Sequence, residues 1–230
     1  MERISSTANP KVKQFVKLKS SAKERERSGL FVLEGLRLCL DLLRSEQTAE
    51  VLFFTEAAAA KSGKELALLQ EQSKSAFLIS EAVSEKLSET RHGQGVYCIV
   101  SMPKQEALPL SSVGKYLLLE NIQDPANLGA ISRTAEALGI TGLFLSGGCD
   151  KYSPKALRSS MGALLRLPVY QTKEVTEFLK KANTVGLKTY ASTPETDAIP
   201  VSAANFCGGV LLVIGNEANG VTAETQSLCQ

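Results

Sequence analysis

The 230-residue sequence contains no tryptophan, a single histidine (His92) and five scattered cysteines. Because no two cysteines form a Cys-x-x-Cys pair, a zinc site of cysteine and histidine has too few ligands at suitable spacing. An odd, dispersed set of cysteines also argues against a disulfide framework, so we expect reduced thiols, no metal and a cytoplasmic location. No apolar run approaches the roughly 20 residues that cross a bilayer, and the polar amino terminus lacks the apolar core of a signal peptide.

The sequence also carries little net charge, +2 at pH 7, so a partner has to be inferred from where the charges lie. Residues 1–27 carry eight basic but only three acidic side chains. Asn9-Pro10 suits a helix start, and interleaved apolar residues predict a helix with one apolar and one basic face. Those apolar residues are Val12, Phe15, Val16 and Leu18. A basic face suits RNA phosphates, but a solvated surface helix explains the same pattern.

Short apolar segments alternate with helical ones through the first hundred residues, which predicts a small α/β sandwich over residues 1–101. The expected strands are 30–33, 51–54, 76–80 and 95–100, and the expected helices are 36–43, 57–72 and 82–87. Residues 102–112 contain two prolines and end in serines, a composition typical of a linker.

The alternation resumes at residue 113, where the expected strands are apolar at nearly every position. Such strands are typical of a parallel sheet that is covered on both faces. They are 116–120, 142–146, 167–170, 187–192 and 209–215, and the expected helices are 128–138, 156–164 and 174–182. Ligands of open parallel sheets bind beyond the carboxyl ends of the strands, so the turns that follow these strands are the candidate sites.

The first such segment, 117–140, ends a strand in Asn-Ile-Gln-Asp-Pro and continues into a helix that Asn127 can cap and Gly139 can end. Arg133 then falls within the first two turns, where the helix dipole disfavours a cation. A phosphate there would remove this cost and accept two hydrogen bonds from the guanidinium. From spacing alone, an ordinary exposed helix arginine is the simpler interpretation.

Two further segments follow strands. Segment 148–169 places Lys155 and Arg158 beside small hydroxylic residues, which suits phosphate contacts, with ordinary surface charge as the competing interpretation. Segment 213–221 contains Gly215 and Gly220 but lacks the Lys-Ser/Thr that a Walker loop requires. Its Gly-Asn-Glu turn after a buried strand lets backbone groups approach a ligand closely.

Together, these segments resemble the SpoU (TrmH) family of SPOUT methyltransferases. N-x-G-A-x-x-R-T-A at 127–135 resembles the first family motif, and I-G-N-E-x-x-G at 214–220 resembles the second. S-P-K-A-L-R-x-S-x-G at 153–162 is similar to the segment between them. N-P-x-V-K at 9–13 and F-V-L-E-G at 31–35 resemble the family's RNA-binding domain, which is like certain ribosomal proteins.

The resemblance implies that residues 113–230 form a methyltransferase domain, a parallel sheet with a carboxyl-terminal trefoil knot, which pairs as a homodimer. It implies S-adenosylmethionine as cofactor, S-adenosylhomocysteine as product, no metal, no membrane, and the ribose 2′-hydroxyl of RNA as substrate, with rRNA favoured over tRNA. The residues carried over are Arg133, Asn127 and Glu217 as catalytic; Thr193, Ile214, Gly215, Asn216, Glu217 and Gly220 for the cofactor; and Asn9, Lys11, Lys13, Lys155 and Arg158 for RNA.

The family's third motif, P-M-x-G followed by S-L-N-V-S, has no counterpart before Gln230, so we expect an incomplete knot in these residues. A missing tail explains this better than an inactive protein, because the two preceding motifs are intact. The alternatives are a non-catalytic RNA-binding protein that kept the fold and a related enzyme that methylates a base nitrogen. We expect Arg133 to clamp a phosphate and stabilise developing alkoxide rather than act as a base, because a free guanidinium has a pKa above about 12.

Overall fold

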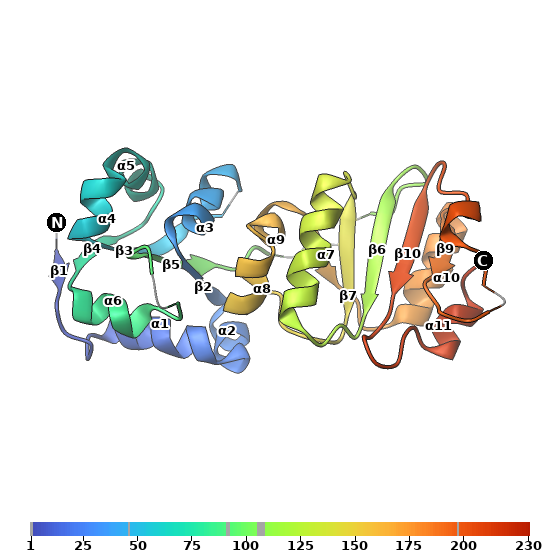
Figure 1. Cartoon of the computed structure of the whole chain (residues 1–230), viewed down its shortest axis with the longest axis horizontal. Coiled ribbons are helices and arrows are strands. Elements are labelled where there is room, and N and C mark those ends of the chain that lie inside the picture. Colours follow the sequence, from blue (N-terminus) through green and yellow to red (C-terminus); the bar gives the residue numbers. More distant parts are fainter. Residues whose placement is uncertain (1, 46, 91–92, 105–108, 197) are drawn as a thin grey trace. The chain divides into compact units, whose positions relative to one another are not determined.

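The structure of the protein is a computed structural model, and its described residues form two compact units (Figure 1). The described residues are 2–45, 47–90, 93–104, 109–196 and 198–230. The first unit comprises Met1–Lys104 and Asp150–Arg166, and the second comprises Gln105–Cys149 and Leu167–Gln230. His92 lies outside the described residues. Within the described ranges, every helix is too short or too polar to cross a membrane.

The first unit is built on a mixed sheet of five strands in the order β1-β4-β3-β5-β2. β5 pairs antiparallel with β2 and β3, whereas β1, β4 and β3 run parallel. The strands are β1 (Arg3–Ile4), β2 (Leu30–Glu34), β3 (Ala49–Thr55), β4 (Ala76–Ile79) and β5 (Val96–Ser101). All four strands expected here are confirmed, and the two-residue β1 is too short to leave a pattern in the sequence.

The amino-terminal helix α1 (Pro10–Ser20) confirms the prediction from the sequence. The Asn9 side chain caps it by accepting a hydrogen bond from the Lys11 amide at 2.9 Å. Its buried residues, Val12, Phe15 and Leu18, belong to the core of the first unit. Of its basic side chains, Lys13 and Lys17 are exposed, whereas half-buried Lys19 donates to the backbone carbonyl of Leu87 at 2.9 Å.

Two helices expected as continuous are each broken in the first unit. The expected 57–72 helix is interrupted at Ser62, and the expected 156–164 helix is interrupted at Ser160–Gly162, where Met161 and Gly162 adopt positive φ of 48° and 84°. The helices of this unit besides α1 are α2 (Ala22–Ser28), α3 (Leu36–Leu40), the 3-10 helix η1 (Asp41–Arg44), α4 (Glu56–Lys61), α5 (Gly63–Glu71), α6 (Glu81–Leu87), α8 (Pro154–Ser159) and α9 (Ala163–Arg166).

The second unit is built on a sheet of five strands in the order β8-β7-β6-β10-β9. Every pair in it is parallel, which confirms the prediction from the apolar strands. The strands are β6 (Lys115–Glu120), β7 (Gly142–Ser146), β8 (Val169–Gln171), β9 (Lys188–Ala191) and β10 (Val210–Ile214). The helical elements are α7 (Pro125–Ala137), α10 (Val175–Val185), the 3-10 helix η2 (Val201–Ala203) and α11 (Ala223–Ser227).

Helix α7 begins three residues before the expected start, and this changes two interpretations. Asp124 caps the helix by accepting a hydrogen bond from the Ala126 amide at 2.9 Å, so the prediction that Asn127 is the cap is wrong. Arg133 consequently lies in the third turn, beyond the first turn where the helix dipole acts, and the argument for an unfavourable cation there no longer holds. Gly139, with φ of 70°, follows the end of the helix as expected.

The sequence pattern predicts an apolar face of Ile131, Ala135 and Leu138 on this helix, and only part of it is buried. Ala135 is 2% exposed, whereas Leu138 is 72% exposed. The buried residues are Leu128, Gly129, Ser132 and Ala135.

Candidate active site

Two loops meet at the carboxyl edge of the parallel sheet in the second unit. β6 and β10 are neighbours, with Leu119 opposite Ile214, so the chain leaves both strands at the same edge (Figure 1). The loop after β6 leads into α7, and the loop after β10 is the Gly-rich segment 215–220. The strand order therefore brings together two sequence segments that lie about ninety residues apart.

The carboxylate of Glu217 joins these two loops. It accepts hydrogen bonds from Asn127 Nδ2 at 2.9 Å and from the backbone amides of Gln123 and Asp124, each at 3.2 Å. The Asn127 hydrogen bond first, together with the backbone amides, lowers the pKa of Glu217 from 4.5 to about 2. The side chain is therefore anionic at neutral pH and fixes the start of α7 against the second loop.

A second link between the two loops comes from Asn216, the residue directly before Glu217. Asn216 Nδ2 donates to the backbone carbonyl of Asn121 at 2.9 Å, and Gln123 Nε2 donates to Asn121 Oδ1 at 2.6 Å. Asn121 has φ of 57°, a left-handed conformation that asparagine tolerates better than most residues. Asn121 was not among the predicted site residues, although an asparagine directly after a buried strand is a signal for such a turn.

The loop after β10 is held tightly closed on itself. Asn216 and Gly220 exchange backbone hydrogen bonds of 3.0 and 2.9 Å. A Cβ added at Gly215 would lie 2.1 Å from the Gly220 carbonyl carbon and 2.2 Å from the Val221 nitrogen, so only glycine fits there. Half-buried Ile214 precedes the loop.

The buried carboxylate of Glu120 holds α11, the helix that follows this loop in sequence. Glu120, 8% exposed at the end of β6, accepts hydrogen bonds from the Thr222 amide and hydroxyl, both at 2.9 Å, and from the Thr225 hydroxyl at 2.8 Å. These bonds hold α11 against the strand from which α7 also departs. Glu120 was not among the predicted site residues, because a glutamate at a strand end gives no local sign of partners a hundred residues away.

Two other predicted residues lie at or near this edge without joining the network. Thr193 follows β9, the other neighbour of β10, and is half-buried, with its hydroxyl accepting from the Glu195 amide at 3.3 Å. Arg133 is exposed on α7, six residues and therefore about 9 Å along the helix axis from Asn127. Within the described chain, its guanidinium makes no hydrogen bond or ion pair.

The predicted RNA-contacting residues all belong to the first unit, and several have structural partners there. Besides the cap formed by Asn9, Lys11 Nζ lies 5.2 Å from the centroid of the Phe77 ring. Arg158 Nη1 lies 2.6 Å from a carboxylate oxygen of Glu89. Two lysines, Lys13 and Lys155, are exposed.

Comparison with known proteins gives matches over both units. Residues 114–230 match the model of the SpoU rRNA Methylase family, and residues 9–98 match that of the MRM3-like substrate binding domain. An uncharacterized tRNA/rRNA methyltransferase of Synechocystis sp. is 34% identical over 98% of this chain and 82% of its own length. The 23S rRNA (guanosine(2553)-2′-O)-methyltransferase of Bacillus subtilis is 29% identical over 97% of this chain and 86% of its own.

Solved structures agree with these sequence matches. A crystal structure of an RNA 2′-O ribose methyltransferase superposes with a TM-score of 0.82 at 29% identity, covering 99% of this chain and 87% of that one. The SpoU methyltransferase AviRb from Streptomyces viridochromogenes, in complex with the cofactor AdoMet, superposes with a TM-score of 0.83 at 25% identity, covering 96% and 86%. The pairing of a mixed-sheet unit with a parallel-sheet unit is thus shared along the whole chain.

Proposed function

The chain belongs to the SpoU rRNA Methylase family, and on that basis we propose that it methylates the 2′-hydroxyl of a ribose in ribosomal RNA. The observation that carries the proposal is the contact between Asn127 and Glu217, because it joins the two family motifs at the edge where parallel sheets bind ligands. The similarity to 2′-O-methyltransferases over nearly the whole chain supports the same substrate. Residues 1–101 serve as the RNA-binding domain, 102–112 as the linker, and the protein acts in the cytoplasm.

S-adenosylmethionine fits the loop after β10. A loop that is closed by backbone hydrogen bonds, with half-buried Ile214 before it and half-buried Thr193 after the neighbouring strand β9, suits a flat adenosyl group that is recognised by its edges. Gly215, Asn216 and Gly220 hold the shape of this loop. When bound, the cofactor supplies a methyl group on a sulfonium and leaves as S-adenosylhomocysteine. In this proposal, the parallel-sheet domain carries a trefoil knot and pairs with a second copy of the chain in a homodimer.

The residues of this chain position the nucleophile. The ribose oxygen has to approach the methyl carbon opposite the bond to sulfur, and holding that geometry lowers the barrier by roughly 7–11 kcal/mol. Arg133, exposed and without an internal partner in the described chain, clamps the phosphate next to the target ribose and stabilises the developing alkoxide. Asn127 and Glu217 hold the start of its helix, and the hydroxyl proton leaves to another group or to water.

The test is mass-spectrometric mapping of ribose methylation in ribosomal RNA from cells with and without this gene. We expect one ribose methylation to disappear in the deletion strain and to return with the wild-type chain. Arg133→Ala should fail to restore it, whereas Lys180→Ala, which removes an exposed cation from α10 of the same unit, should restore it fully. An unchanged methylation map in the deletion strain, or no affinity of the full chain for S-adenosylmethionine in calorimetry, contradicts the proposal.

A further inference from the structure

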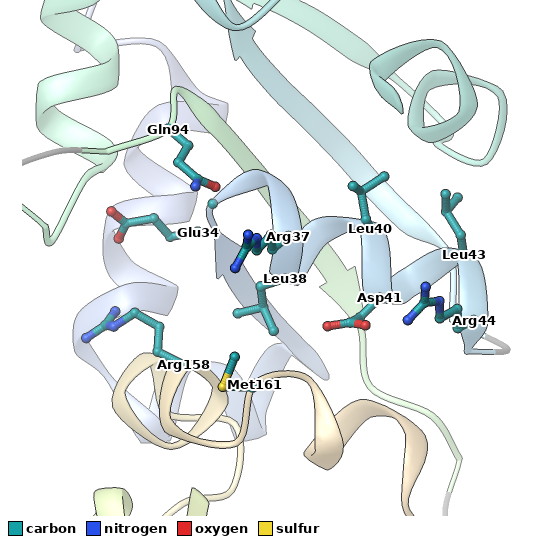
Figure 2. A pocket seen from close by; sticks show the side chains of 11 residues that line it. Glu34, Arg37, Leu38, Leu40, Asp41, Leu43, Arg44, Gln94, Arg158 and Met161 are labelled. Carbon is teal, nitrogen blue, oxygen red and sulfur yellow. The ribbon is translucent and has the colours of Figure 1, made fainter. Parts of the chain in front are cut away.

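The first unit contains a pocket of about 550 Å³ that lies outside the motif loops (Figure 2). One wall is the segment that leaves β2 and forms α3 and η1, and it carries Arg37, Leu40 and Arg44. The facing wall comes from α8 and the turn after it, and it carries Arg158 and Met161. A volume between roughly 300 and 1,000 Å³ is typical of sites that enclose a small ligand.

The acidic side chains of this pocket are already engaged. Glu34 accepts hydrogen bonds from the Ser88 hydroxyl at 2.7 Å, the Thr90 hydroxyl at 2.8 Å and the Glu89 amide at 2.9 Å. Asp41 pairs with Arg166 at 2.5 Å. Both carboxylates are therefore neutralised or fully hydrogen-bonded within the unit and offer little to a cationic ligand.

The arginines on the α3–η1 wall differ in this respect. Arg37 and Arg44 are both exposed, and neither makes an ion pair or side-chain hydrogen bond with a described residue. Two guanidinium groups without carboxylate partners at the rim of one pocket attract an anion with several oxygens. Guanidinium groups bind phosphate through two parallel hydrogen bonds, so phosphate is the anion best matched to them.

The pocket also has an apolar part that is shaped in advance. Leu40 lines it from the end of α3 and Leu43 from η1, and Met161 is 54% exposed on the opposite wall. The turn that carries Met161 is held by Arg166, which donates to the Met161 carbonyl at 3.2 Å and pairs with Asp41 at 2.5 Å. An apolar surface between two arginines and a methionine suits the flat face of a nucleobase.

One polar group points to recognition of a base edge. Gln94 Oε1 accepts the Leu36 amide at 2.7 Å, which fixes the orientation of the side-chain amide. Its Nε2 makes no hydrogen bond within the described chain, and Gln94 lines the pocket. This nitrogen is consequently available as a donor to a ligand.

We propose that this pocket binds one unstacked nucleotide of the substrate RNA, with the base against Leu40, Leu43 and Met161 and the neighbouring phosphates on Arg37 and Arg44. The identity of the RNA rests on the proposed function, whereas the preference for a nucleotide rests on the pocket. Proteins recognise RNA mainly where bases are splayed out of the helix, and a duplex with stacked bases does not present one to a concave site.

Met161 provides a local probe, because the chain contains only three methionines. The full chain carrying [13C-methyl]methionine is titrated with a single-stranded uridine oligonucleotide, the four nucleoside 5′-monophosphates, an RNA duplex, inorganic phosphate and polyglutamate. We expect the Met161 methyl resonance, assigned from its absence in Met161→Leu, to move with single-stranded RNA and with at least one monophosphate, and the Met102 resonance to stay. A Met161 shift seen only with phosphate or polyglutamate, or equally with duplex, overturns the proposal.

Variants at the rim test the phosphate contacts. Arg37→Ala and Arg44→Ala should each weaken binding of single-stranded RNA about tenfold and reduce the slope of log affinity against log salt by roughly 0.7. Both side chains are exposed, so circular dichroism should match the wild type. Lys64→Ala, which removes an exposed cation elsewhere in the unit, is the matched control. Arginine variants that bind RNA as tightly as this control overturn the proposal, while methylation mapping and cofactor calorimetry report on the proposed function separately.

Discussion

Replacing Glu217 by glutamine is the most direct perturbation of the network that joins the two motif loops. The glutamine oxygen can still accept the hydrogen bonds of Asn127 and of the Asp124 amide, which both go to Oε1 of Glu217. The amide nitrogen of the glutamine, however, then takes the place of Oε2 and faces the backbone N–H group of Gln123, which is also a donor. The change therefore removes the negative charge and at least one of the acceptor positions while conserving the volume of the side chain.

The magnitude follows from the pKa of Glu217. Lowering it from 4.5 to about 2 corresponds to roughly 3 kcal/mol in a fully shielded site, at about 1.4 kcal/mol per tenfold change. Because the side chain is exposed, solvent screening reduces this value to about 1–2 kcal/mol. A loss of that size should lower the melting temperature of a chain of this length by roughly 2–8 °C.

Thermal unfolding followed by circular dichroism measures this loss, since the chain has no tryptophan to report by fluorescence. The pKa of Glu217 is lower in the folded chain than in the unfolded one, so its contribution is complete above about pH 4.5 and is lost as the pH falls toward 2. The difference in stability between wild type and Glu217→Gln should accordingly stay constant from pH 7 to about 4.5 and shrink below it.

The matched control is Glu177→Gln on α10 of the same unit, an exposed glutamate without a side-chain partner among the described residues. We expect it to change stability by no more than about 0.5 kcal/mol. A Glu217 carboxyl that titrates near 4.5 by NMR, or equal melting temperatures for the two variants, would refute the reasoning.

Three further outcomes follow from the structure. Gly215→Ala should abolish binding of S-adenosylmethionine in calorimetry, because the added Cβ meets the Gly220 backbone and the loop has to open. Arg25→Ala should cost about 3 kcal/mol in urea unfolding, because Arg25 is 4% exposed and donates to Asp150 Oδ2 at 2.7 Å; a loss below about 1 kcal/mol contradicts that view. Arg133→Lys should lower methyl transfer at least about tenfold without weakening cofactor binding, and near-normal turnover would mean that a two-pronged phosphate contact is not essential.

The central strands were predictable from the sequence because most of them, such as β3, β5, β6 and β7, are buried along nearly their whole length. Leu118 and Val213, for example, are fully buried in neighbouring strands of the parallel sheet. A run of consecutive apolar residues indicates such a strand, because only a strand that is covered on both faces requires apolar side chains at every position. The type of sheet and the edge where ligands bind follow from that pattern without knowledge of any contact.

The helix breaks were not predictable in this way, because tertiary packing decides them. The segment around Met161 and Gly162 has a composition compatible with a continuing helix. Arg166 donates to the Met161 carbonyl at 3.2 Å and pairs with Asp41 at 2.5 Å, so a residue about 120 positions away helps to hold this turn. The grouping of Asp150–Arg166 with the first unit has the same origin, since Arg25 and Asp41 form their ion pairs with Asp150 and Arg166 of that segment.

The error over Asn127 bears directly on how the site works. If Asn127 were the cap, its side chain would be hydrogen-bonded to a backbone amide in the first turn of its own helix. Asp124 instead supplies that cap three residues earlier, which leaves the Asn127 amide to donate to Glu217. The contact also requires β10 to lie beside β6 although three strands separate them in sequence. The connection between the motifs therefore depends on one local choice of cap and one global choice of strand order, and changing either would leave Glu217 without its strongest partner.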